Sequence, residues 1–108
     1  MKKKPSKGNG DGLASLRAEI DECDGQIIEL LARRFRLVRK VGEYKAIHSL
    51  PVLDEARENE LLSDRKRQAG ENYPVEEIFK LILEQSRRIQ MKVREQLNPS
   101  KIESKQGE

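Results

Sequence analysis

The chain has 108 residues, of which 35% are hydrophobic, 4% aromatic and 38% charged, with a formal net charge of +3. This length supports one domain at most, and the absence of a long apolar run excludes a membrane-spanning helix, which needs about 20 apolar residues. One cysteine and one histidine exclude an intrachain disulfide and the usual zinc sites. The few aromatic residues argue against base-stacking nucleic-acid modules.

The positive charge is concentrated at the N-terminus. Residues 1–12 contain four lysines and one aspartate, whereas residues 13–97 contain 16 basic and 16 acidic residues. Because Gly, Lys, Asn and Ser dominate residues 1–12, we expect a disordered basic leader, and no apolar segment follows that would make it a signal peptide. We expect residues 98–108, which are neutral overall, to form a flexible tail. A basic surface for nucleic acid is therefore not predicted.

Residues 13–47 are predicted to form one very long helix, interrupted only by Gly25 and Gly42 and ended by about Ser49, ahead of Pro51. Its seam residues recur with alternating spacings of four and three, as in packed helices: Leu16, Ile20, Cys23, Ile27, Leu30, Arg34, Leu37, Val41 and Tyr44. Such a helix is roughly 52 Å long at ~1.5 Å per residue, longer than a domain of this size. It cannot bury its whole stripe within one chain, so we expect a homodimer.

Two shorter helices are predicted after it. The second begins after Asp54 as N-cap and runs to about Gln68. The third begins with Pro74 at its first position and carries apolar residues at helical spacing as far as Val93. No segment shows the alternation of a strand, so the predicted fold class is all-α, with three helices in one domain over residues 13–97.

Polar side chains occupy positions where these stripes should be apolar. Arg34 lies on the seam of the first helix, where a charge is costly without an anionic partner. Lys45 lies on the same helix face, about 16 Å further along, so the two cations can converge on a small anion. In the third helix Ser86 and Gln90, one turn apart, continue the apolar stripe as hydrogen-bonding groups.

Each of these residues also has a purely structural interpretation. Arg34 can fix the register of a dimer by pairing with an acid across the interface, and Lys45 can be a solvated residue at a helix end. The polar pair of the third helix can be satisfied core residues. By default, Arg57 and Glu58 complement the dipole of the second helix or lie on its surface, and Arg87-Arg88 is part of a solvated face.

Taken together, four segments resemble the all-helical, AroQ-type chorismate mutases. In chain order they are LASLRAEID, LLARRFRLVRKVGEYK, PVLDEARENELL and FKLILEQSRRIQ, and the resemblance covers residues 13 to about 91. It implies an intertwined helical homodimer that converts chorismate to prephenate by a Claisen rearrangement, in phenylalanine and tyrosine biosynthesis. It also implies a cytoplasmic enzyme with chorismate as its small-molecule partner, no cofactor or metal, and no nucleic-acid or membrane partner.

The same resemblance assigns the site residues. Arg17 and Arg34 would hold the two carboxylates of the substrate, with Arg17 supplied by the other subunit. The two residues are roughly 25 Å apart along one helix, which agrees with a site shared between chains. Lys45 and Gln90 would donate to the ether oxygen, and Glu58 would accept a hydrogen bond from the ring hydroxyl. The predicted catalytic residues are Lys45, Gln90 and Arg34, and the further substrate contacts are Arg17, Asp54, Arg57, Glu58 and Ser86.

This reaction requires none of the catalytic groups that the sequence lacks. It is unimolecular and needs no nucleophile, proton transfer or metal, so catalysis must come from holding the reactive conformation and stabilising charge on the ether oxygen. Two alternatives remain open. One is an isochorismate pyruvate lyase, a family that is similar in fold and shares the cation positions, although Glu58 favours the mutase. The other is a noncatalytic helical dimerisation or regulatory module.

Overall fold

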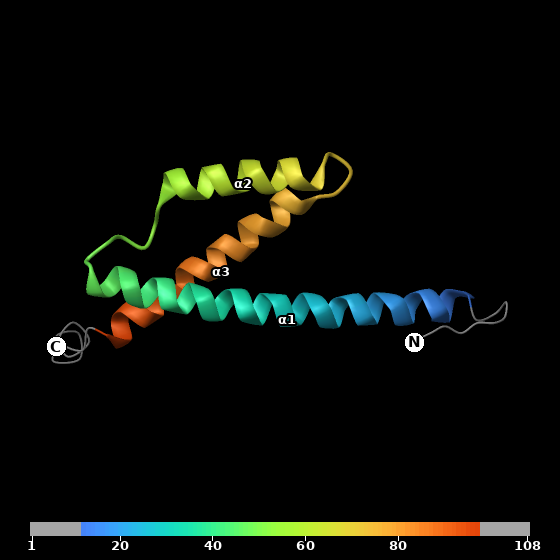
Figure 1. The fold of residues 1–108 in the computed structure, drawn as a ribbon, viewed down its shortest axis with the longest axis horizontal. Coiled ribbons are helices and arrows are strands. Elements are labelled where there is room, and N and C mark those ends of the chain that lie inside the picture. The colour runs from blue at the N-terminus through green and yellow to red at the C-terminus, as the bar shows by residue number, and fades with distance from the viewer. Residues whose placement is uncertain (1–11, 98–108) are drawn as a thin grey trace, which may run out of the picture. The chain divides into compact units, whose positions relative to one another are not determined.

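The computed structural model describes residues 12–97, and all regular structure within that range is helical (Figure 1). In chain order the helices are α1 (Gly12–Ile47), α2 (Glu55–Ala69) and α3 (Val75–Gln96). This confirms the predicted all-α class with three helices. Gly12, the last residue of the predicted leader, is the first residue of α1, and the rest of the leader and the predicted tail lie outside the described residues.

The described residues fall into two units, which divide within α1 between Arg34 and Phe35. The first unit is one helical segment whose apolar side chains are largely exposed, with Leu16 at 59%, Ile27 at 53% and Leu30 at 62%. In the whole of α1 the only buried residue is Gly42. The apolar stripe of α1 is therefore not covered by the part of the chain that the structure describes.

The second unit contains the end of α1 together with α2 and α3. After Ile47 the chain turns through Ser49, whose φ of 56° lies in the left-handed region. Asp54 caps α2, because its Oδ1 accepts a hydrogen bond from the backbone N–H of Arg57 at 3.0 Å. Gly70, with a φ of 78°, ends that helix and donates its N–H to the carbonyl of Lys66. Both ends of α2 are thus where local sequence signals place them.

The predicted start of α3, like that of α1, differs from the structure by a single residue. Pro74 is the N-cap of α3 and not its first helical residue, with φ −82° and ψ 52°. The proline ring fixes φ at a value that both the N-cap and the first helical position accept. The two positions differ in ψ, and the ψ of 52° at Pro74 is not helical.

The core of the second unit is small, and α2 and α3 pack together within this unit (Figure 1). Leu61 of α2 is 3% exposed, and Leu83 and Val93 of α3 are 7% and 1% exposed. The buried stripe of α3 also includes Ser86 and Gln90. No helix among residues 12–97 is long and apolar enough to cross a membrane.

Candidate active site

Two polar side chains lie in the buried stripe of α3. Ser86 is 4% exposed and Gln90 is 8% exposed. The hydroxyl of Ser86 donates to the carbonyl of Ile82 at 2.7 Å, within its own helix. The amide oxygen of Gln90 is buried and has no hydrogen-bond partner among the described residues. A buried acceptor left unpaired costs about 1–3 kcal/mol, so the description of a satisfied core residue does not fit Gln90.

The backbone of α1 approaches Gln90 closely at Gly42. A Cβ atom at Gly42 would lie 3.1 Å from the Cα of Gln90 and 3.3 Å from its Cβ and Cγ. Distances this short are tighter than ordinary van der Waals contact, so a side chain at Gly42 would require Gln90 to shift, and glycine allows this close approach of α1 to α3. The prediction of site residues did not include Gly42. The only sequence signal was a poor helix former inside a long helix, a cost that calls for a packing reason.

Lys45 is half-buried and points toward the segment that joins α1 to α2. Its ammonium donates to the carbonyl of Val52 at 2.7 Å, and no carboxylate among the described residues pairs with it. From α3, Arg94 donates to the carbonyl of Leu50 in the same segment. Lys45 is therefore not a solvated residue at a helix end. Together, the two cations fix the segment that leads into Asp54, the cap of α2.

Glu58 and Arg87 join α2 to α3. The guanidinium of Arg87 donates to Oε1 of Glu58 at 2.5 Å, and the side chains are 32% and 20% exposed, respectively. The second carboxylate oxygen of Glu58 makes no hydrogen bond with the described residues. The expectation that Arg87 belongs to a solvated face is wrong. The same expectation is correct for Arg88, whose side chain is 68% exposed and pairs with Glu84 within its own helix.

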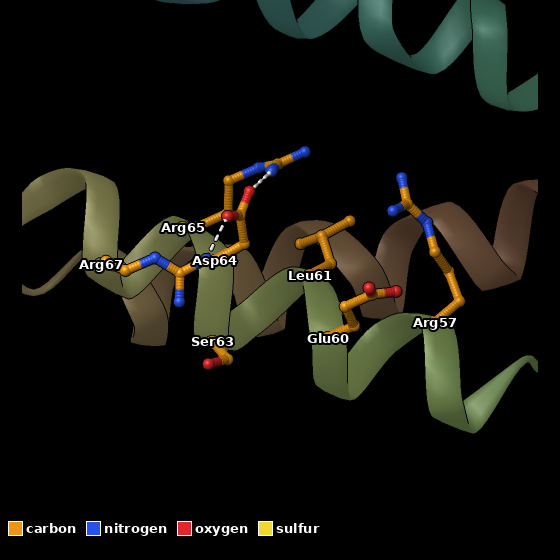
Figure 2. Close-up of a pocket in the computed structure, with 7 residues that line it drawn as sticks. All are labelled: Arg57, Glu60, Leu61, Ser63, Asp64, Arg65 and Arg67. Carbon is orange, nitrogen blue, oxygen red and sulfur yellow. Dashed lines mark hydrogen bonds and ion pairs between the residues drawn. The ribbon is translucent and has the colours of Figure 1, made fainter.

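Asp54 and Arg57 are exposed at the start of α2. The guanidinium of Arg57 has no partner among the described residues, and it lines a concavity of about 360 Å³ along the helix. Figure 2 shows Arg57 on one side of Leu61 and the ion pair of Arg65 with Asp64 on the other. The concavity also includes Glu60, Ser63 and Arg67.

The structure thus places the predicted site residues in two groups. The second unit contains six of them: Lys45, Asp54, Arg57, Glu58, Ser86 and Gln90. The first unit contains an exposed Arg17 and a half-buried Arg34 that is engaged in an interaction of its own. Within residues 12–97, no group of three or more His, Cys, Asp or Glu side chains is arranged to hold a metal ion. The group in the second unit combines two cations, two carboxylates and two buried hydrogen-bonding side chains, which suits a polar organic anion.

Comparison with known proteins identifies the family to which the chain is similar. A family model described as chorismate mutase type II matches residues 16–91. A chorismate mutase of Methanocaldococcus jannaschii is 34% identical over 83 residues, which cover 72% of this chain and 83% of that protein. No solved structure gives a significant match.

Two further relatives show how the similarity is distributed. The T-protein of Enterobacter agglomerans is 40% identical over 57 residues, which cover 53% of this chain but only 15% of that protein. The chain therefore spans a small part of such relatives. A 4-amino-4-deoxychorismate mutase of Streptomyces venezuelae is 31% identical over 67 residues, covering 62% of this chain and 64% of that protein.

Proposed function

The chain belongs to the type II chorismate mutase family, and from this premise we propose that it catalyses the Claisen rearrangement of chorismate to prephenate. The observation that carries the proposal is Gln90, a buried amide on the core face of α3 whose oxygen has no partner among the described residues. An apolar residue at this position would make the folded protein more stable. A group kept at such a cost is typical of a site that binds a polar ligand.

The reaction breaks one C–O bond and forms one C–C bond within a single molecule. Its barrier falls when the enolpyruvyl side chain is held over the ring, so binding both carboxylates in that conformation is the first task. Arg34 and Arg17 would perform it, because a guanidinium grips a carboxylate with two parallel hydrogen bonds. Arg57, whose side chain has no described partner, is available for a further carboxylate contact.

Negative charge develops on the ether oxygen as its bond to the ring lengthens, and the second task is to stabilise it. Lys45 suits this role because its ammonium has three N–H donors and only one is used by Val52. The amide N–H₂ group of Gln90 would be the second donor. Glu58 can accept from the ring hydroxyl with the oxygen that Arg87 leaves unused. Asp54 and Ser86 complete the proposed contacts.

We place this site in a homodimer with Arg17 supplied by the second subunit. Two observations support this arrangement: the apolar stripe of α1 is largely exposed in the single chain, and Arg17 lies 17 positions before Arg34 in the same helix. That separation is roughly 25 Å, more than one small dianion can bridge. The proposed role is in phenylalanine and tyrosine biosynthesis, and the proposed compartment is the cytoplasm.

The direct test is an assay of the purified protein with chorismate. We expect spectrophotometric loss of chorismate with prephenate as the product, and no release of pyruvate from isochorismate. Pyruvate release without formation of prephenate would indicate a lyase. An unchanged chorismate signal together with no thermal shift on adding chorismate would indicate a noncatalytic helical module.

A further inference from the structure

We propose that Arg87 is a specificity-determining residue, which makes the site prefer a hydroxyl over an amino group at the ring carbon that Glu58 contacts. This inference rests on the proposed function. It concerns a residue outside the predicted site, and it is carried by the ion pair between Arg87 and Glu58.

This ion pair differs from the one that the neighbouring Arg88 makes. It joins side chains 29 positions apart, at 2.5 Å, and both are partly shielded, with 32% and 20% of their surfaces exposed. By contrast, Arg88 and Glu84 pair within one helix at 68% and 44% exposure. Solvent screens the exposed pair more strongly, so the charge of Arg87 acts more strongly on its carboxylate than the charge of Arg88 does.

Arg87 is also close in sequence to the buried polar stripe of α3. It directly follows Ser86 and lies three positions before Gln90, a spacing that makes side chains neighbours on a helix surface. The backbone of Arg87 therefore adjoins residues proposed to contact the substrate, and its positive charge is held against Glu58, another of those residues.

The chemistry of the pair favours a neutral hydrogen-bond donor. One oxygen of Glu58 is occupied by Arg87 and the other can accept from a hydroxyl. An amino group at the same carbon is largely an ammonium at neutral pH. It would meet a carboxylate that is already neutralised and would be repelled by the guanidinium beside it. Without Arg87 the free carboxylate of Glu58 would attract that ammonium.

The test compares kcat/KM for chorismate and for 4-amino-4-deoxychorismate at neutral pH. We expect the wild-type protein to prefer chorismate. Arg87→Met should reduce the ratio of the two constants by about tenfold or more, since a like charge beside the ligand is removed. Arg87→Lys keeps the charge and should retain most of the preference. Arg88→Met removes the same formal charge on the adjacent residue and should leave the ratio unchanged.

The ratio does not depend on the fraction of folded protein, so partial instability of a variant does not affect it. Glu58→Gln gives a second test, because it leaves Arg87 without its counter-ion and should shift the ratio further toward chorismate.

The inference is overturned if Arg87→Met leaves the ratio unchanged, or if Arg88→Met changes it as much. A wild-type protein that turns over neither compound would overturn the proposed function as well, whereas turnover of chorismate with an unaltered ratio overturns this inference alone.

Discussion

Gln90 is the site residue whose surroundings differ most from those of an ordinary core position. It is 8% exposed, its oxygen has no described partner, and the backbone of α1 lies directly against it at Gly42. An amide donates hydrogen bonds without titrating, whereas a carboxyl in its place donates only when it is protonated. In the proposed mechanism, the identity of this side chain therefore determines how activity depends on pH.

For the wild-type protein we expect a kcat that is nearly constant from about pH 6 to 9, because neither the rearrangement nor Gln90 involves a proton. Gln90→Glu should lose activity at neutral pH and recover it toward acid pH, as the new carboxyl becomes protonated. The measurement is kcat as a function of pH for both proteins. If the variant has the wild-type profile, Gln90 does not donate to the ether oxygen.

At the scale of the helices, local signals were enough to predict the elements. Asp54 caps α2 and Gly70 ends it, as their residue types indicate. Contacts between helices could not be predicted from local signals. Glu58 and Arg87 are 29 positions apart, and no periodicity in either helix says which partner each will meet. The resemblance supplied Glu58 but not Arg87, because only the packing of α2 against α3 brings the two together.

The close approach of α1 and α3 at Gly42 leads to a test of helix packing. Gly42→Ala adds a methyl group 3.1 Å from the Cα of Gln90, so Gln90 must shift. Overpacking of this kind costs about 1–3 kcal/mol, and a displaced donor should lower kcat by about tenfold with little change in KM. Gly25→Ala is the matched control, since the same methyl group meets nothing within 4 Å there.

The same substitution in a Gln90→Ala background separates positioning from general damage. If Gly42 acts through Gln90, Gly42→Ala should have almost no further effect on kcat once the amide is gone. Equal losses of kcat in both backgrounds would show that Gly42 supports the fold and does not position Gln90. Thermal melting of all four proteins gives the accompanying stability change.

At the scale of the molecule, the single chain leaves much apolar surface in contact with solvent. Ile20 is 57% exposed, Leu37 52% and Val41 44%, all on the stripe that the spacing of the sequence predicts. A stripe of this length resembles half of an interface between long helices. The predicted length of the first helix, residues 13–47, indicated such an interface, because so long a helix cannot bury its whole stripe within one chain of this size.

The proposed assembly makes each site depend on two chains, and mixing two inactive variants tests this most directly. In a dimer of Arg17→Ala with Gln90→Ala, one site contains both substitutions and the other contains neither. An equal mixture that has exchanged subunits should therefore recover about 25% of wild-type chorismate mutase activity, since half of its dimers are mixed and each has one intact site of two.

The control is a mixture of Arg17→Ala with the double variant Arg17→Ala, Gln90→Ala, which cannot form an intact site. Native mass spectrometry of both mixtures establishes that subunits have exchanged. The account predicts that prephenate formation returns to about a quarter of the wild-type rate in the first mixture and stays at the level of the parents in the second. Mixed dimers that are no more active than their parents would contradict the shared site.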